Sequence, residues 1–211
     1  MMLNFSFFKS LPLKPTQLLG PVLLCLLTSL AIIFDKQIVN QSVYHHALIE
    51  QGQLWRLITG HLLHTNVNHY LLNIAGVTLL WTLHGHFYTT ASYCKLFIFS
   101  GLFCSIGLFD FSPETTQYVG LSGVLHGIFV WGACKDILAK DKTGYLLLLG
   151  VCIKLAHEQI FGASTDIAQL ISAPVAVDAH LWGAISGIAY LIVTQLRNRK
   201  SHYKNDSNKR K

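Results

Sequence analysis

The stretch YVGLSGVLHG, residues 118–127, places one serine between two glycines inside an otherwise apolar run. The glycines, Gly120 and Gly123, remove side chains from one flank of the helix that this run predicts, which lets a second helix approach closely. On such a helix Ser122 lies near the start and His126 lies one turn deeper. Two interpretations are open: Ser122 packs against a neighbouring helix, or it is a nucleophile that needs a base from elsewhere in the chain.

The composition of the whole chain is typical of an integral membrane protein. Its 211 residues are 52% hydrophobic and only 12% charged, with a mean hydropathy of +0.44, whereas roughly a quarter of the residues of a soluble domain are charged. Several apolar segments approach the ~20 residues that cross a bilayer. They span residues 17–34, 64–83, 91–109, 119–137, 145–161 and 180–196. The sequence therefore predicts an all-α polytopic membrane protein with six transmembrane helices.

Lysine and arginine gather in alternate connections, which predicts the orientation because positively charged loops stay in the cytoplasm. Residues 197–211 carry seven Lys or Arg against one Asp, which accounts for the whole net charge of +6. Such a tail is typical of a cytoplasmic anchor, so we expect no nucleic-acid partner. We expect both termini in the cytoplasm, a single membrane domain over residues 1–196, and a basic, disordered cytoplasmic tail over residues 197–211.

The first outer connection, residues 35–63, is long and amphipathic. Its apolar residues alternate with polar neighbours, a pattern that favours a position in the plane of the membrane interface. Aromatic and basic side chains commonly lie among the lipid headgroups. We therefore expect Trp55 and Arg56 at headgroup level.

A second polar cluster, GHLLHTNVNHYLLN, spans residues 60–73 and enters the second predicted helix. His69 and Asn73 are four residues apart and share a helix face, with His64 about one turn nearer the outer surface. Polar side chains inside a membrane are costly, so they indicate either a functional site or hydrogen bonds between helices. Both interpretations stay open on this cluster alone.

We expect no metal and no cofactor. Histidines are common zinc ligands, but this cluster lacks an HExxH pattern and a nearby carboxylate. The five cysteines are scattered singly and form neither a CxxC metal pattern nor a plausible disulfide framework. We therefore interpret the cysteines as small apolar residues that are buried between helices.

A third stretch, DAHLWGAISG, spans residues 178–187 at the start of the sixth predicted helix. His180 lies at the outer end of this helix, at the same depth as Ser122, and the two glycines of its GxxxG motif favour a close helix contact. A serine and a histidine on two such helices would lie within hydrogen-bond reach, as an activated nucleophile requires. Asp178 would point away from His180, so we interpret it as a helix N-cap.

Three motifs resemble, in this order, the motif set of the rhomboid intramembrane serine proteases: WRLITGHLLHTNVNHYLLN, GLSGVLHG and AHLWGAISG. They lie on, or just before, the second, fourth and sixth predicted helices. The resemblance extends over roughly residues 55–187. It implies that Ser122 is the nucleophile and His180 the base, in a dyad without a third carboxylate. It also implies that His69 and Asn73, with the backbone N–H of Ser122, stabilise the oxyanion.

Finer features are similar to the rhombosortase branch of bacterial rhomboids: the small size, the bare six-helix core, the histidine after the serine, and the predicted fifth helix. On that helix Lys154 and Glu158 are four residues apart and can form an ion pair within the membrane. We interpret this pair as structural. Further candidates for supporting the active site are His64, Gly120 and His126. For His126, a hydrogen bond across the bundle and a place beside the active-site water pocket remain equal alternatives.

The resemblance to rhombosortases implies particular partners. These are secreted proteins that end in a Gly-Gly motif, an apolar helix and a basic cluster, and they are cleaved near the glycines. The implied location is the bacterial inner membrane, with the active site facing the periplasm. The phospholipid bilayer would then supply an amine headgroup that can accept the acyl group in place of water.

Three other functions remain open from the sequence. The first is a general rhomboid protease that cleaves other transmembrane substrates. The second is a catalytically inactive rhomboid-like protein that binds membrane proteins. The third is a small transporter with a proton relay made of His64, His69, Lys154 and Glu158.

Overall fold

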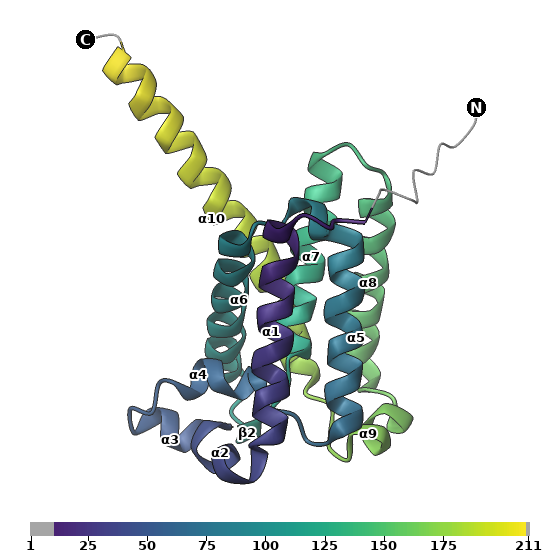
Figure 1. The fold of residues 1–211 in the computed structure, drawn as a ribbon. Helices are drawn as coiled ribbons and strands as arrows, with labels where there is room; N and C mark the ends of the chain where they lie inside the picture. Colours follow the sequence, from purple (N-terminus) through teal and green to yellow (C-terminus); the bar gives the residue numbers. More distant parts are fainter. Residues whose placement is uncertain (1–10, 210–211) are drawn as a thin grey trace, which may run out of the picture.

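The structure is a computed structural model that describes the backbone of residues 11–209 and the side chains of residues 11–34 and 38–198. Within the described backbone, the long helices pack side by side in one bundle (Figure 1). They are α1 (Pro15–Ile33), α5 (Val67–His84), α6 (Thr90–Phe111), α7 (Ser122–Leu138), α8 (Thr143–Phe161) and α10 (Val177–Lys209). These helices correspond in order to the apolar segments of the sequence.

Four of the helices are long and apolar enough to cross a membrane: α1, α6, α8 and the part of α10 from Val177 to Asn198. Helix α5 contains polar residues such as His69 and Asn73 within its apolar sequence, and α7 has only 17 residues. The mostly helical, membrane-spanning architecture is therefore confirmed, whereas the count of six crossings stays a prediction.

Helix α10 does not end at Leu196, where the sequence analysis placed the boundary of the membrane domain. It continues through the basic residues as far as Lys209, and Figure 1 shows this part projecting beyond the bundle. A helix that is already formed extends at low cost, because each further residue adds a backbone hydrogen bond without a new nucleation step. For the backbone of residues 197–209, the structure is thus helical where we expected disorder.

The short elements gather at the end of the bundle where α7 begins (Figure 1). They are α2 (Asp35–Ser42), β1 (Tyr44–His45), α3 (His46–Glu50), α4 (Arg56–Thr59), η1 (Gly60–Leu62), β2 (Gln117–Tyr118) and α9 (Thr165–Ile171). At the opposite end, η2 (Gly85–Phe87) joins α5 to α6. The two strands pair in antiparallel fashion, with Tyr44 opposite Tyr118. This pairing ties the long first connection to the segment that leads into α7.

Arg56, which we expected at headgroup level, is only 3% exposed, so its polar groups are satisfied within the protein, and its depth in the membrane stays a prediction. The guanidinium donates to the backbone carbonyls of Val43 at 2.7 Å and Asn40 at 2.9 Å. Arginine carries five donors and can satisfy several carbonyls of an irregular connection that have no helical partner. The neighbouring Trp55 is 54% exposed, as a residue at the membrane interface would be.

Helix α7 lies at the centre of the bundle and packs against α5, α6, α8 and α10. Its contact with α10 is made through glycines. A Cβ atom on Gly183 would lie 1.9 Å from the carbonyl oxygen of Gly123, and one on Gly187 would lie 2.3 Å from that of Gly127. The backbones of the two helices are therefore in direct contact, as the glycine pattern predicts.

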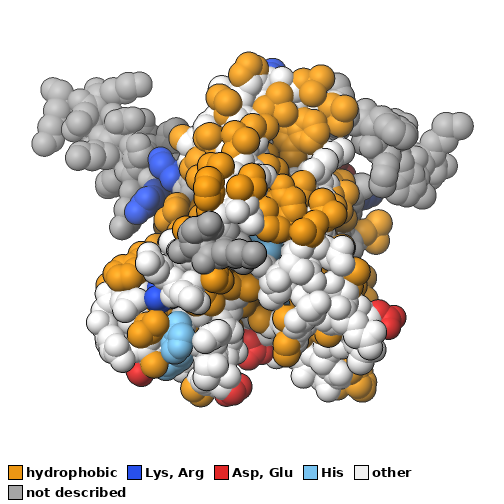
Figure 2. Space-filling model, turned by 60° about the horizontal axis from the view of Figure 1, so that its bottom comes forward, with side chains coloured by type: hydrophobic (Ala, Val, Ile, Leu, Met, Phe, Trp, Pro, Cys, Tyr) orange, Lys and Arg blue, Asp and Glu red, His pale blue; other side chains and the backbone are white. Residues whose placement is uncertain are grey.

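The surface of the molecule agrees with a membrane location. Large apolar side chains such as Leu146 and Ile153 of α8 are more than half exposed. Figure 2 shows hydrophobic side chains gathered on the flank of the bundle, whereas the end with the short helices shows more polar surface and isolated acidic side chains. Such an apolar flank faces lipid at little cost, while a soluble monomer rarely exposes one of this extent.

Candidate active site

The segment that leads into α7 holds Ser122 at the first position of the helix. Gly120 adopts a φ of +133°, a backbone angle that residues other than glycine rarely adopt. Its N–H donates to the carbonyl of Gly60 at 3.1 Å, and the hydroxyl of Tyr118 donates to its carbonyl. The sequence predicted Gly120 as a supporting residue but not Tyr118, which lies two residues earlier; this spacing alone does not show the contact of its hydroxyl.

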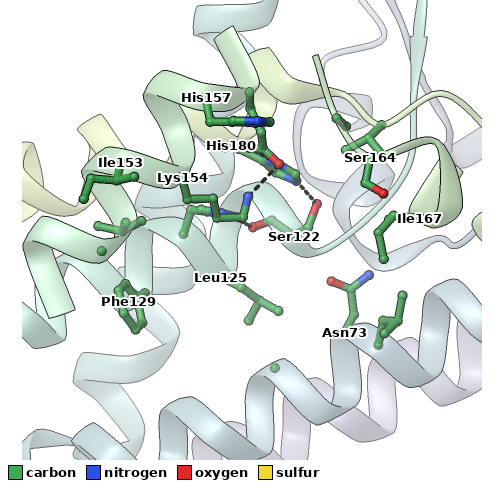
Figure 3. Close-up of a pocket in the computed structure, with 18 of the residues that line it drawn as sticks. Asn73, Ser122, Leu125, Phe129, Ile153, Lys154, His157, Ser164, Ile167 and His180 are labelled. Atoms are coloured by element: carbon green, nitrogen blue, oxygen red, sulfur yellow. Dashed lines mark hydrogen bonds and ion pairs between the residues drawn. The ribbon is translucent and has the colours of Figure 1, made fainter. Parts of the chain in front are cut away.

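His180 lies beside Ser122 across the contact between α7 and α10. Its Nε2 atom is 3.0 Å from the Oγ of Ser122, and its side chain is only 8% exposed. Both residues come from the first turn of their helices, and Figure 3 shows the contact between the two side chains. The structure therefore brings together the serine and the histidine that the sequence predicts as a pair.

A carboxylate lies on the other side of the His180 ring. Oε2 of Glu158 is 2.9 Å from Nδ1 of His180, and Oε1 is 2.7 Å from Nζ of Lys154. The predicted ion pair of α8 is thus present. The same carboxylate also contacts the base of the predicted dyad, where we expected no carboxylate. The sequence indicated the depth of Glu158, in the last turn of its helix, but not the direction of its side chain.

His126 packs on the His180 ring from the side of α7. The two rings are stacked, with centroids 4.3 Å apart and an angle of 21° between their planes. Nδ1 of His126 is 2.8 Å from the backbone carbonyl of Ser122, one turn earlier in the helix. His126 also lines the cavity beside Ser122, so the structure favours the active-site interpretation over a hydrogen bond across the bundle.

His69 lies next to the backbone that precedes Ser122. A Cβ atom on Gly120 would lie 2.9 Å from Nε2 of His69, so only a glycine leaves room for the ring. On the far side of the ring, the N–H of Thr65 donates to Nδ1 at 3.4 Å. The ring is thus held through Nδ1, with Nε2 directed toward the start of α7.

Asn73 lies one turn below His69 on the same face of α5. Its amide donates to the carbonyl of His69 at 3.1 Å, and the side chain is 4% exposed. In Figure 3 the amide points into the cavity from the side opposite Ser122. Both predicted oxyanion residues therefore line the same cavity as Ser122 and His180.

The outer histidines of this cluster lie behind the site. Burial lowers the pKa of His64 to about 3 and that of His61 to about 4, so both rings are neutral at physiological pH. His61 binds Ser105 Oγ at 2.9 Å, and His64 stacks edge-on against His69, with ring centroids 5.1 Å apart. His64 therefore supports His69 and does not reach the cavity.

One cluster among the described side chains has the spacing of metal ligands: His126, Glu158 and His180, whose ligand atoms lie within 4.8 Å of one another. In this cluster Glu158 and His180 already bond to each other, and Lys154 places a positive charge on the same carboxylate. A cation would have to displace these partners and would be repelled by the lysine. The chemistry of the donor set therefore favours acid–base catalysis over a metal site.

These side chains border a cavity of about 1070 Å³. Its walls come from α5, α7, α8 and α9 and are mostly apolar, with Leu125, Phe129, Ile153 and Ile167 among the lining residues (Figure 3). A cavity of this size can hold a short stretch of polypeptide. Ser122 and His180 lie together on one part of an otherwise apolar wall, and Asn73 faces them across the cavity (Figure 3).

A family model described as the rhomboid domain matches residues 51–197. The chain belongs to the rhomboid family. YdcA, assigned as a rhomboid protease in Bacillus subtilis (strain 168), is 31% identical over 153 residues, which make up 72% of this chain and 73% of YdcA. The rhomboid protease GluP of the same organism is 28% identical over 108 residues, 51% of this chain and 20% of GluP. Rhomboid membership and the apolar helices together make the chain a multi-pass membrane protein.

Asp178 does not have the role that the sequence suggested. Helix α10 begins at Val177, so Asp178 lies inside the first turn and not at the N-cap. Its Oδ1 atom accepts a hydrogen bond from Nε2 of Gln159 at 3.3 Å. An acidic residue in the first turn still favours the helix through its dipole. The carboxylate that contacts His180 is that of Glu158, from α8.

Proposed function

We propose that this rhomboid is an intramembrane serine endopeptidase in which Ser122 is the nucleophile and His180 the general base. The observation that carries the proposal is the 3.0 Å contact between Nε2 of His180 and Oγ of Ser122 on the wall of an apolar cavity within the bundle. A serine is a weak nucleophile until a base lies within hydrogen-bond distance. The relatives named as rhomboid proteases support the same reaction class.

The reaction follows from the placement of the groups. His180 takes the proton of Ser122 while Oγ attacks the carbonyl carbon of the substrate. The negative charge that develops on the carbonyl oxygen is stabilised by the backbone N–H of Ser122, in the first turn of α7, and by His69 and Asn73. His180 then protonates the leaving amine, and an acyl-enzyme ester remains on Ser122.

The cavity supports a membrane-tethered substrate. Apolar side chains of α5 and α8 line it, including Leu72 and Ile153, which are 44% and 62% exposed. An apolar segment of a substrate can lie against this wall without leaving the lipid, while its scissile bond reaches Ser122. Ser122, His69, Asn73 and His180 supply the polar groups of the cleavage point.

The substrates that we propose are secreted proteins with a C-terminal signal made of a Gly-Gly motif, an apolar helix and a basic cluster. This specificity rests on the likeness of GLSGVLHG and of the fifth apolar segment to the rhombosortases. The chain then crosses the bacterial inner membrane six times, with both termini in the cytoplasm and the site toward the periplasm. Water or the primary amine of a lipid headgroup resolves the acyl-enzyme.

The specificity is tested with purified protein in vesicles that contain phosphatidylethanolamine. A substrate with the Gly-Gly signal should be cleaved near the glycines, at a rate at least ~10-fold above that of a matched substrate with Val-Val at the same positions. Intact-mass spectrometry of the new C-terminus distinguishes a free carboxylate from an attached headgroup. Equal cleavage of the two substrates would reject the Gly-Gly specificity and leave a general rhomboid protease.

His69 and Asn73 provide a separate prediction. His69→Ala should lower kcat by about 10²-fold, because the loss of one oxyanion donor typically costs 10² to 10³ in rate. Asn73→Ala should lower kcat in the same direction, and KM should change little in both variants. Steady-state kinetics on one substrate measures both values. A rise in KM at constant kcat would show that these side chains bind substrate and do not stabilise the transition state.

A further inference from the structure

Glu158 contacts His180 on the ring nitrogen that faces away from Ser122. The distances along this chain of groups are 2.7 Å from Lys154 to Glu158, 2.9 Å from Glu158 to His180 and 3.0 Å from His180 to Ser122. Glu158 lies in the last turn of α8, and His180 lies in the first turn of α10. Three different helices therefore meet in one continuous line of polar groups.

This arrangement determines where the proton of the neutral His180 ring lies. An ionised carboxylate can only accept hydrogen bonds, so Nδ1 must carry the proton and donate it to Glu158. Nε2 is then unprotonated and directs its lone pair at the hydroxyl of Ser122. A base needs this tautomer, because the opposite one would present an N–H to the serine.

The orientation of the carboxylate indicates more than an ion pair on the surface of α8. The side chain of Glu158 is 11% exposed, whereas that of Lys154 is 46% exposed. The carboxylate of Glu158 thus points inward toward His180, and the ammonium group of Lys154 pairs with it from the more exposed side. Exposed ion pairs of this spacing contribute little to stability, while a hydrogen bond to a charged group in a poorly solvated site is stronger.

We propose that Glu158 is the positioning residue of the serine and histidine pair, so that the site works as a Ser–His–Glu triad. Glu158 holds the His180 ring in the productive tautomer and stabilises the imidazolium that forms when His180 accepts the proton of Ser122. This role rests on the proposed serine protease function. No proton passes to Glu158, which stays ionised and paired with Lys154 throughout.

The test compares two variants that break the same ion pair. Glu158→Gln keeps the size of the side chain but removes its charge, and kcat should fall by about 10³-fold with little change in KM, because the corresponding change in a serine protease triad costs about 10⁴. Lys154→Met removes the ion pair without touching His180, and kcat should fall by less than ~10-fold. Thermal unfolding of both variants in detergent controls for folding.

The pH profile of the reaction distinguishes a positioning role of Glu158 from a purely structural one, because a structural role would leave the profile unchanged. The acid limb of kcat/KM should shift to lower pH in Glu158→Gln, because the lost negative charge no longer favours the protonated ring. Other titratable or charged groups near the ring are unchanged in this variant: His69 of α5, His126 of α7 and Lys154 of α8. The shift therefore reports on Glu158.

Equal losses of kcat in Glu158→Gln and Lys154→Met, or an acid limb that stays in place, would overturn the proposal. Such a result would leave the serine protease function intact, provided that Ser122→Ala is inactive. If Ser122→Ala cleaves substrate normally, the protease function itself fails. The two failures are therefore distinguishable in the same set of proteins.

Discussion

Ser122→Ala should abolish cleavage of a membrane-tethered substrate, with a loss of at least ~10⁴-fold in kcat. The change removes the only atom that can form the acyl-enzyme in the proposed mechanism, and loss of the serine in a protease triad costs on the order of 10⁶ in rate. The reaction is followed by gel mobility of a substrate in vesicles. Because Ser122→Ala removes one hydroxyl and keeps a small side chain with high helix propensity, the variant should insert and accumulate normally.

His180→Ala is the matched variant on the partner helix, and it should be equally inactive, since serine and base act as a unit. A fluorophosphonate probe should label the wild-type protein at Ser122, label His180→Ala far more slowly and leave Ser122→Ala unlabelled. The probe also distinguishes an enzyme from an inactive rhomboid-like binding protein, which would not react. Normal substrate processing by Ser122→Ala would refute catalysis at this serine.

The pairing of Ser122 with His180 could be predicted from the sequence because a membrane constrains the possibilities. Helices that cross a bilayer are nearly parallel, so position along a segment gives depth. Glycines then indicate which helices approach most closely. Gly123 and Gly183 carry both signals, and the structure places their backbones in contact. Order, depth and glycine spacing were thus enough to place serine and histidine together.

The contact of Glu158 with His180 depended on information that the sequence does not display directly. Lys154 lies four residues before Glu158, and this spacing explains the glutamate without any other partner. The rotation of α8 about its axis, which turns the carboxylate toward α10, is set by packing against α7 and α10. Arg56 is a similar case, because an amphipathic pattern does not show which carbonyls of a connection need donors.

The second large expected effect concerns the contact between the glycines of α7 and α10. Gly183→Val should destabilise the protein by about 3 kcal/mol, the upper part of the range for overpacking a tight contact. The added Cβ atom alone would lie 1.9 Å from the carbonyl oxygen of Gly123, so the backbones of α7 and α10 must separate. These two helices carry Ser122 and His180, and a misplacement of 1 Å can cost about 10² in rate. We therefore expect a loss of at least about 10²-fold in kcat.

Gly150→Val in α8 is the matched control, because nothing lies within 4 Å of a Cβ atom built on Gly150. Replacing glycine by valine changes the intrinsic helix propensity by the same amount at both positions, so the difference in thermal unfolding isolates the contact of α7 with α10. Because Gly150 also lines the cavity, KM of both variants is measured beside kcat. Thermal unfolding in detergent and kcat measure both effects. If Gly183→Val matches Gly150→Val in both measurements, the close contact is not what holds serine and base together. If Gly183→Val unfolds at a lower temperature but retains activity, the site tolerates helix separation, and the pairing of Ser122 with His180 must be held mainly by Glu158 and His126.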